Sequence, residues 1–308
     1  MPLTPTEKIW MDGELVDWDQ AKIHVLTHSL HYGLGVFEGI RAYPTSQGPA
    51  VFRLTDHIAR LFASAKILGI TIPFTTGQII DAVKKVVVVS GLEGCYIRPI
   101  VYLGYGEMGL NPMQCGVNVA IACWSWGAYL GDEGIQNGIR LKVSSWARHD
   151  SRAMPTAAKA TGMYINSSLA KVEAVRAGYD EAVMLTTDGH LSEGTGENVF
   201  VVRHGRLLTP AFSSAGALEG ITASSVRAIA QDLGYDVAES NLRRTDLYLA
   251  EEAFLCGTAA EVVPIASVDD RPVGSGKPGP ITKAIQDVFF QAVRGEVDRY
   301  KDWVEHVT

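Results

Sequence analysis

The sequence predicts a mixed α/β protein built from two domains, and three observations support this fold class. Amphipathic helical stretches and short apolar, strand-like stretches occur together along the chain. They do not alternate strictly, which disfavours a doubly wound fold. A glycine-rich stretch separates the two halves, and a length of 308 residues suits about two domains of ordinary size. We expect a smaller N-terminal α/β domain at residues 1–126, a linker at 127–137 and a larger C-terminal domain at 138–308.

Helices and strands of the first half follow from the spacing of apolar residues. Residues 55–68 and 77–89 each place apolar side chains on one helical face, and Thr76 is a suitable cap for the second helix. Residues 95–104 alternate as a strand does. Pro99 lies inside this strand and cannot donate a main-chain hydrogen bond, so we expect an edge strand or a bulge there. A nearly continuous apolar strand follows, at residues 117–126.

The second half contains several short strands separated by helices and turns. Asp188-Gly189 and His204-Gly205 are typical of hairpin turns, and Gly178, Gly234 and Gly295 follow the ends of three expected helices. The expected elements are helices at 164–177, 221–233 and 281–293, and strands at 141–146, 181–187, 198–202, 207–209, 253–256 and 262–268.

Composition excludes several classes of protein. A net charge of −7 disfavours a nucleic-acid-binding surface, which would be basic. The four cysteines form no C-x-x-C pair and no cluster with metal-ligand spacing, so we expect no metal site and a reduced compartment. The N-terminus lacks the apolar core of a signal peptide, and no run approaches the roughly 18 apolar residues of a membrane helix. We therefore expect a cytoplasmic protein.

Lys159 is the first candidate for chemistry. It lies among the small residues Ala157, Ala158, Ala160 and Gly162, just before a predicted helix. A nucleophilic lysine must lose its proton, which requires a partly buried site. The small, uncharged neighbours offer no exposed ion-pair partner, but a solvated loop lysine remains the alternative for this residue taken alone.

Acidic and anion-binding patterns supply further candidates. Glu193 and Glu197 flank glycines just after a hairpin turn, where a carboxylate can approach a ligand closely; a solvated surface turn is the alternative. The segment Leu218-Glu219-Gly220-Ile221-Thr222 opens a helix whose free N–H groups would favour a phosphate. Gly257-Thr258-Ala259-Ala260 could form a second cluster of N–H groups, and Arg60 could clamp phosphate oxygens. Taken singly, Thr222 as a helix cap, Gly257 as a turn residue and Arg60 as a solvated side chain remain alternatives.

Seven segments in register carry a resemblance that covers the chain from about Ile9 to Phe290. They are His31-Tyr32-Gly33, Val36-Phe37-Glu38-Gly39-Ile40-Arg41, Tyr96-Ile97-Arg98-Pro99, Trp126-Gly127-Ala128-Tyr129-Leu130-Gly131, Pro155-Thr156-Ala157-Ala158-Lys159, Ser192-Glu193-Gly194-Thr195-Gly196-Glu197-Asn198 and Gly257-Thr258-Ala259-Ala260-Glu261. With them, the chain resembles the branched-chain amino acid aminotransferases of the fold-type IV enzymes, which use pyridoxal 5′-phosphate (PLP).

This resemblance implies the residues that hold the cofactor. Lys159 would carry PLP and, once freed, move the proton between the substrate and the cofactor. Glu193 would face the pyridine nitrogen, where an acid makes the ring an electron sink. Tyr164 would reach the phenolic oxygen of the ring. The remaining cofactor-binding residues that the resemblance implies are Arg60, Glu197, Leu218, Gly220, Ile221, Thr222, Gly257 and Thr258.

The resemblance also implies how substrates bind. Tyr96 and the N–H groups of Thr258 and Ala259 would hold the substrate α-carboxylate. Arg98 would bind the distal carboxylate of glutamate or 2-oxoglutarate, since an arginine among apolar neighbours needs a partner. The apolar pocket would be lined by Phe37, Tyr164, Trp126 and Tyr129, with Tyr32 and Leu110 from the neighbouring subunit.

The implied reaction transfers the amino group of L-leucine, L-isoleucine or L-valine to 2-oxoglutarate through a PLP/PMP ping-pong cycle in branched-chain amino acid biosynthesis. The implied fold is type IV, with a barrel-like β core in the C-terminal domain, and the implied assembly is a homodimer or a higher homo-oligomer. Three alternatives stay open: a D-amino-acid or (R)-amine transaminase, a lyase similar to aminodeoxychorismate lyase, and a protein that binds PLP without turnover. The sequence departs from the family pattern at Thr161, where glycine is expected, and at Met163, Glu219 and Cys256, where a smaller polar residue, proline and serine are expected.

Overall fold

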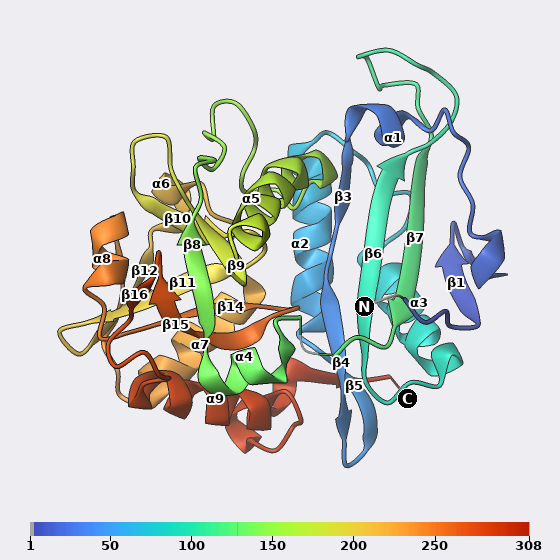
Figure 1. Ribbon diagram of the computed structural model, residues 1–308. Helices are drawn as coiled ribbons and strands as arrows, with labels where there is room; N and C mark the ends of the chain where they lie inside the picture. Colours follow the sequence, from blue (N-terminus) through green and yellow to red (C-terminus); the bar gives the residue numbers. More distant parts are fainter. Residues whose placement is uncertain (1–2, 128, 308) are drawn as a thin grey trace. The chain divides into compact units, whose positions relative to one another are not determined.

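A computed structural model describes residues 3–127 and 129–307. It divides the chain into two compact units, each with its own sheet (Figure 1). Unit 1 consists of residues 1–126, 158–162 and 292–308, and unit 2 consists of residues 127–157 and 163–291. The short segment with Lys159 therefore belongs to unit 1. The domain bounds expected from the sequence stay a prediction.

Unit 1 is built on an antiparallel sheet in which the strands follow the order β17-β5-β4-β6-β7-β1-β2, and β3 also pairs with β6. The strands are β1 (Lys8–Met11), β2 (Glu14–Asp17), β3 (Gly35–Phe37), β4 (Ile40–Thr45), β5 (Gly48–Phe52), β6 (Cys95–Leu103), β7 (Val117–Trp124) and β17 (Val304–His306). The last of these comes from the C-terminal end of the chain and pairs with β5, so the chain finishes in the unit where it began.

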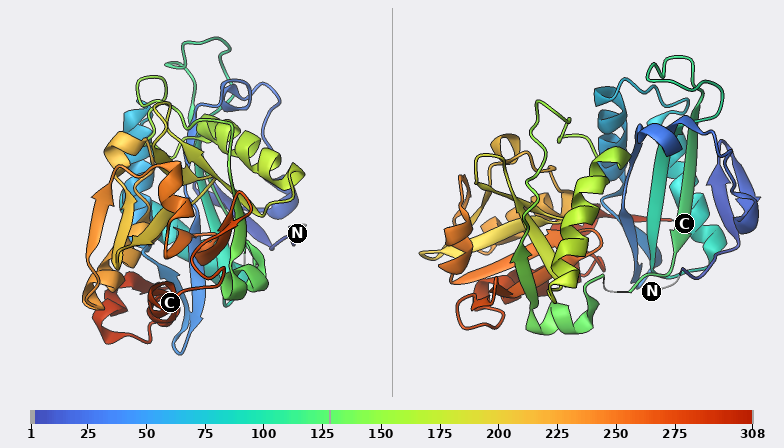
Figure 2. Two further views of the ribbon diagram at one scale, coloured as in Figure 1. Left: turned by 60° about the vertical axis from the view of Figure 1, so that its left-hand side comes forward. Right: turned by 45° about the horizontal axis from the view of Figure 1, so that its top comes forward.

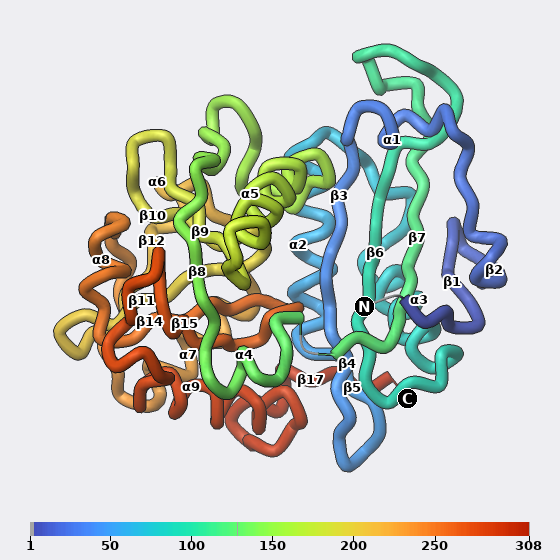
Figure 3. The backbone as a smooth tube through the Cα atoms, in the orientation of Figure 1, coloured from blue at the N-terminus to red at the C-terminus, as the bar shows by residue number. Residues whose placement is uncertain are grey.

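Two helices cover one face of this sheet, α2 (Leu54–Ile67) and α3 (Thr76–Ser90), while the short α1 (His28–Tyr32) lies at the end of β6 (Figure 3). Their apolar stripes pack into the core of unit 1, which confirms both expected helices. The expected cap at Thr76 is wrong. Thr75 caps α3 instead, in a reciprocal pair with Gln78, because only the residue before the first helical turn can point its oxygen at the free N–H groups.

Pro99 lies in an interior strand, so the expected edge strand or bulge is wrong. β6 pairs with β7 on one side and with β3 and β4 on the other. The reason is a break in the neighbouring chain at Glu38-Gly39, between β3 and β4, directly beside Pro99. The Pro99 carbonyl accepts from the Glu38 N–H at 2.9 Å, and no partner there requires the N–H that proline lacks.

Unit 2 is built on a mixed sheet with the strand order β10-β9-β8-β15-β14-β11-β12-β13, and β16 pairs with β15. The pairs β8–β9, β8–β15 and β12–β13 are parallel, and the other pairs are antiparallel. The strands are β8 (Ile139–Val143), β9 (Glu181–Leu185), β10 (Leu191–Gly194), β11 (Asn198–Arg203), β12 (Arg206–Pro210), β13 (Val237–Ser240), β14 (Glu252–Gly257), β15 (Glu261–Val268) and β16 (Arg271–Pro272).

The helices of unit 2 pack around this sheet: α5 contacts β9, α7 contacts β14, and α4 contacts β15 (Figure 2). Their bounds are α4 (Gly131–Asn137), α5 (Tyr164–Arg176), α6 (Phe212–Ala215), α7 (Ile221–Asp232), α8 (Arg244–Tyr248) and α9 (Pro280–Ala292). The three expected helices, the expected strands and both hairpin turns of the second half are confirmed, with end shifts of up to a few residues.

The glycine-rich stretch expected to be a linker is partly helical, because α4 occupies Gly131–Asn137. It packs on β15, which explains why a segment with two glycines still forms a helix. Ala128, which belongs both to this stretch and to a motif of the sequence analysis, lies outside the described residues. The mixed α/β class is confirmed.

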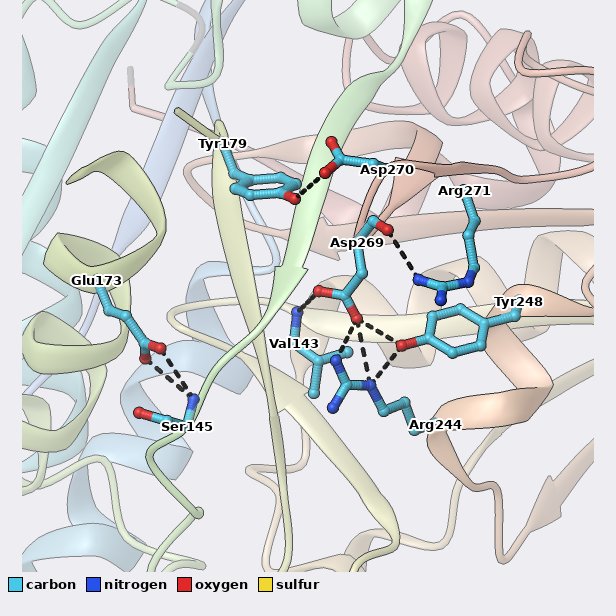
Figure 4. A network of polar contacts seen from close by, with 9 residues as sticks. All are labelled: Val143, Ser145, Glu173, Tyr179, Arg244, Tyr248, Asp269, Asp270 and Arg271. Atoms are coloured by element: carbon cyan, nitrogen blue, oxygen red, sulfur yellow. Dashed lines mark hydrogen bonds and ion pairs between the residues drawn. The ribbon is translucent and has the colours of Figure 1, made fainter. Parts of the chain in front are cut away.

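A network of polar contacts fixes the turn between β15 and β16 (Figure 4). The turn residues Asp269 and Asp270 both have positive φ. Asp269 accepts from the Val143 N–H at 3.1 Å, from the Tyr248 hydroxyl at 2.6 Å and from Arg244 at 2.6 Å. Burial alone would raise the pKa of Asp269, but the bonds from Tyr248 and Arg244 lower it. These bonds join α8 and β8 to the β15–β16 hairpin.

The structure also describes the apolar helices and the four cysteines. No helix in the described part of the chain is long and apolar enough to cross a membrane. All four cysteines are buried as free thiols. Their positions agree with the interpretation that they are small core residues.

Candidate active site

The Lys159 segment lies against β3 as a short strand-like extension of unit 1. The Phe37 N–H donates to the Lys159 carbonyl at 3.1 Å, and the Gly162 N–H donates to the Gly33 carbonyl at 3.0 Å. Val36 and Ala160 form an antiparallel bridge between them. Lys159 is half-buried, and its Nζ lies 5.1 Å from the centroid of the Phe37 ring. The lysine is therefore held at its main chain on both sides and has an aromatic face beside its amine.

Arg60 is held by a buried carboxylate that the sequence analysis did not single out. Its Nε and Nη2 donate to Glu38 Oε1 and Oε2 at 2.7 and 2.9 Å. His57 Nδ1 lies 2.7 Å from Glu38 Oε2, and Glu38 is fully buried. Helical spacing on α2 places His57 and Arg60 on one face, which is the sequence signal that could have linked them.

Burial and the neighbouring charges determine the charge states of Glu38 and His57. Burial alone would raise the pKa of Glu38, but Arg60 and His57 outweigh burial and hold that pKa far below its usual value. Burial lowers the pKa of His57 despite the neighbouring Glu38 carboxylate. Glu38 is thus an anion paired with Arg60, and His57 is neutral at neutral pH.

Arg98 lies among aromatic rings on the β6 face of unit 1. Its guanidinium carbon is 4.7 Å from the Phe37 ring centroid, 5.4 Å from that of Tyr96 and 5.9 Å from that of Trp124. Its Nη2 donates to the Tyr96 hydroxyl at 3.3 Å, while its buried Nε has no hydrogen-bond partner among the described residues. Within the described part of the chain, no carboxylate lies within ion-pair distance of Arg98. The guanidinium can therefore accept an anionic ligand.

Tyr96 connects this cluster to two further residues. Its ring meets that of Trp126 edge to face, at 4.6 Å between centroids. A Cβ on Gly39 would lie 1.9 Å from the Tyr96 hydroxyl oxygen, so only glycine leaves room for that hydroxyl. Phe37, Tyr96, Arg98 and Trp126, which the sequence analysis grouped, thus lie together. Trp124 was missed, although it is the residue paired with Tyr96 on the next strand.

A cavity of about 360 Å³ lies beside Arg98 on the same face of the sheet. Its lining is almost entirely apolar and is drawn from β6, β7, β1, the 21–30 segment and the Lys159 segment. The lining residues are Ile9, Met11, Ala21, Ile23, Thr27, Ser29, Leu30, Arg98, Ile100, Tyr102, Ala120, Ala122 and Thr161.

Glu193 is buried in unit 2, between an arginine and a main-chain N–H. Arg148 Nη2 lies 2.8 Å from Glu193 Oε1, and the Leu218 N–H donates to Glu193 Oε2 at 2.9 Å. Both partners of the ion pair are almost fully buried. Arg148 was missed, because it follows β8 in a stretch without periodicity. The alternative of a solvated turn is wrong for Glu193.

Glu197 is a buried acid beside a second acid. Its Oε2 accepts from the Gly196 N–H at 3.0 Å. Burial, and then the Glu181 carboxylate, raise the pKa of Glu197 to about 8. Glu181 is fully buried and paired with Lys171 at 2.6 Å. With its pKa raised to about 8, Glu197 keeps its proton at neutral pH.

The expected anion-binding segments have buried, closely fitted backbones. Gly220 caps α7 without a side-chain bond, so the interpretation of Thr222 as the cap is wrong; Ile221 and Thr222 lie in the first turn. Both are buried, and N–H groups of a first helical turn have no intrahelical acceptor. A Cβ on Gly220 would lie 1.9 Å from Asn198 Oδ1, and one on Gly257 would lie 3.1 Å from the Gly196 carbonyl oxygen.

The remaining residues predicted for the site differ in their burial and in the elements that carry them. Tyr164 begins α5 and is half-buried. Tyr129 is half-buried, and the Lys171 Nζ lies 5.1 Å from its ring centroid. Thr258 and Ala259 lie in the tight connection between β14 and β15. The family-pattern departures Met163 and Cys256 are buried.

Comparison with known proteins identifies the family of the chain. The model of the amino-transferase class IV family matches residues 35–268. The chain belongs to this family. It is also 46% identical, over 295 residues, to the branched-chain-amino-acid aminotransferase of Pseudomonas aeruginosa, covering 96% of this chain and 95% of that protein.

Solved structures confirm the class IV aminotransferase fold. The crystal structure of the Escherichia coli branched-chain amino acid aminotransferase matches with a TM-score of 0.96 and 45% identity, over 98% of this chain and 100% of that one. The branched-chain amino acid aminotransferase of Thermobaculum terrenum, in its PLP form, matches with a TM-score of 0.92 and 35% identity, over 99% of each chain. The type IV fold with a barrel-like core, expected from the resemblance, is confirmed.

Replacing Glu197 with glutamine is expected to reduce the stability that this aminotransferase loses as pH rises. The pKa of Glu197 is raised on folding, so its contribution to stability is complete below the unfolded pKa and is lost as pH rises towards about 8. Glutamine has no proton to lose. The free energy of unfolding of Glu197→Gln, relative to the unsubstituted protein, should therefore rise by on the order of a few kcal/mol between about pH 5 and pH 8.

Urea unfolding at several pH values measures this difference. Glu133→Gln, at an exposed glutamate of α4, is the control and should show a constant offset. A constant offset for Glu197→Gln as well would mean that Glu197 is ionised in the folded protein.

Proposed function

We propose that this chain is a PLP-dependent branched-chain amino acid aminotransferase, which moves the amino group of L-leucine, L-isoleucine or L-valine to 2-oxoglutarate and forms L-glutamate. The observation that carries the choice of substrates is the position of Arg98, a cation surrounded by three aromatic rings. Such a pocket suits a branched alkyl group in one half-reaction and a carboxylate in the other. The relatives named above carry the same activity in their names.

The residues present suit PLP. The first turn of α7 and the tight connection after Gly257 would hold the phosphate, and Gly220 and Gly257 allow the close approach of neighbouring groups there. Arg60 adds a guanidinium whose Nε and Nη2 are already oriented by Glu38. Bound PLP supplies an electron sink for the bond-breaking at the substrate α-carbon. Thr258, Leu218 and Gly220 complete the proposed cofactor-binding set.

Each proposed catalytic role uses a property of the side chain concerned. Lys159 holds the cofactor and moves a proton through its Nζ. Glu193, held by its ion pair with the buried Arg148, would stabilise a proton on the pyridine nitrogen. Tyr164 donates to the phenolic oxygen. Glu197 orients the glycine-rich segment next to Glu193 through its bond with Gly196.

Substrate binding follows from the same assignment. The Tyr96 hydroxyl and the N–H groups of Thr258 and Ala259 bind the α-carboxylate. Phe37, Trp126, Tyr129 and Tyr164 line the side-chain pocket, and Arg98 binds the distal carboxylate. Because one more buried methylene changes binding by only about 1–3 kcal/mol, leucine, isoleucine and valine are all substrates.

Two copies of the chain are proposed to form the active dimer, with Tyr32 and Leu110 reaching the partner's substrate pocket. In support, α1 and the loop at residues 104–116 present an apolar surface, tied together by His28 Nε2 and the Gly109 carbonyl at 2.8 Å. Leu110 and Met113 are 86% and 82% exposed. Exposed apolar patches of this kind mark interaction surfaces. The cytoplasmic location stays a prediction.

One assay tests the proposed activity. The protein, PLP and 2-oxoglutarate are mixed separately with L-leucine, L-valine, L-isoleucine, D-alanine or an (R)-amine, and the glutamate formed is measured. The three L-amino acids should be used, and Lys159→Ala should abolish turnover, whereas Lys66→Ala, at an exposed lysine of α2, should retain it. Faster reaction with D-alanine or the amine would assign the chain to the other transaminases of this fold.

Arg98→Ala is expected to separate the two kinds of substrate. Losing a charged hydrogen bond costs on the order of 1.5–3 kcal/mol, so kcat/KM with glutamate should fall about tenfold or more. Leucine has no distal carboxylate, and its kcat/KM should change by less than about threefold. Arg206→Ala, at an exposed ion pair, should change neither. Equal losses with both donors would contradict the role given to Arg98.

Leu110→Glu is expected to weaken the dimer. Placing a carboxylate in a desolvated apolar contact should raise the dissociation constant at least about tenfold, as measured by sedimentation over a range of protein concentrations. Leu249→Glu makes the same change at another exposed leucine and should leave the dimer intact. An unchanged constant for Leu110→Glu would place the interface on a different surface.

A further inference from the structure

We propose that Ser64 and Thr161 are positioning residues, whose hydroxyl groups clamp the main chain on the two sides of Lys159 and so set where its amine lies. This inference rests on the proposed role of Lys159 and adds two residues to which neither the family pattern nor the proposed mechanism gives a part. Both act through the backbone of Lys159 and not on a substrate.

Ser64 forms the first half of the clamp. The Lys159 N–H donates to Ser64 Oγ at 3.0 Å, across 95 residues of sequence. Ser64 is almost completely buried in α2, so no water replaces this bond cheaply. It lies one helical turn after Arg60, whose guanidinium is paired with Glu38. The Glu38–Arg60 pair holds α2, and α2 in turn holds the amide of Lys159.

Thr161 forms the second half. Its Oγ1 donates to the Gly33 carbonyl at 2.7 Å and lies 3.3 Å from the Gly35 carbonyl oxygen. The Gly162 N–H donates to the same Gly33 carbonyl at 3.0 Å. Thr161 stands where the family pattern led us to expect glycine, which has no hydroxyl and leaves the chain more freedom. The residue is therefore a feature of this chain.

The surroundings leave this segment little room to shift. A Cβ on Gly33 would lie 3.0 Å from the Gly162 Cα, and one on Gly35 would lie 3.2 Å from Thr161 Oγ1. The main chains of the two segments are therefore in close contact. The Lys159 N–H therefore has a partner in α2, and the Lys159 carbonyl has one in β3.

Fixing the main chain matters because the lysine side chain is long and flexible. A displacement of about 1 Å in a reacting group can cost a hundredfold in rate. When the backbone is held, the position of Nζ varies only through rotation of the lysine side chain. The nearby Phe37 ring restricts that rotation further. Ser64 alone would hold the main chain on one side of Lys159, and Thr161 adds a restraint on the other side.

The matched pair Thr161→Ala and Thr161→Ser tests the clamp, since the two variants differ by one hydroxyl group. In the full chain with PLP, hydrogen exchange of the Gly162 and Phe37 amides should be about fivefold faster in Thr161→Ala, the effect of one hydrogen bond of about 1 kcal/mol. The kcat for leucine should fall severalfold with KM changed by less than about twofold. Thr161→Ser should restore both quantities.

Thr45→Ala is the control, because it removes a similar bond from a threonine hydroxyl to the Gly48 carbonyl in the β4–β5 turn. It should alter neither the exchange of those amides nor kcat. Unchanged exchange in Thr161→Ala, or no recovery in Thr161→Ser, would overturn the proposal. Exchange does not depend on turnover, so absence of aminotransferase activity in the unsubstituted protein would refute the proposed function and leave the clamp to be judged by exchange.

Ser64→Ala tests the other half independently. The Lys159 amide itself should exchange faster, while the Gly162 amide, held by Gly33, should change little. Equal acceleration at both amides would mean that Ser64 supports the whole segment and does not act on Lys159 alone. Should Ser64→Ala fail to fold, the Thr161 pair decides the proposal.

Discussion

The pairing of the Lys159 segment with β3 is the constraint on which the rest of the proposed site in unit 1 depends. Main-chain bonds from Phe37 and Gly162 give the segment a strand-like register, and its neighbours on β3 lead directly to Glu38 and Gly39. The break at Glu38-Gly39 in turn makes room for Pro99 in β6 and for the Tyr96 hydroxyl. This one local pairing therefore positions Lys159, the ion pair with Arg60 and the first residues of the proposed substrate cluster.

Three buried acids show how the same side chain acquires different charge states. Glu38 lies against Arg60 and remains an anion, because the guanidinium outweighs the cost of burial. Glu193 has Arg148 and a main-chain N–H as partners. Burial and the neighbouring Glu181 carboxylate raise the pKa of Glu197, and Lys171 offsets them only in part. The difference lies in the partner and not in the depth of burial.

Much of the fold could be predicted from the sequence because apolar periodicity is a local property. The stripes of α2 and α3, the glycines that follow α5 and α7, and the hairpin glycines were sufficient to place those elements. The errors arose where a residue's partner is distant in sequence, or where a boundary shifted by one residue. Pro99 was misplaced because the break opposite it lies some sixty residues earlier in the chain, and the helix cap moved from Thr76 to Thr75 because capping depends on one turn of local geometry. Arg148 and Glu181 had no pattern that could have revealed them.

The sequence by itself determined which chemical groups are present and, through seven motifs in register, the aminotransferase family and the lysine proposed to hold the cofactor. Tertiary structure decided what surrounds each group. It paired Glu38 with Arg60, buried Glu193 against Arg148 and placed Thr161 on the Gly33 carbonyl, 128 residues away along the chain. Charge state and side-chain position depend on distances of a few ångströms between residues far apart in sequence, and such distances exist only once the chain has folded.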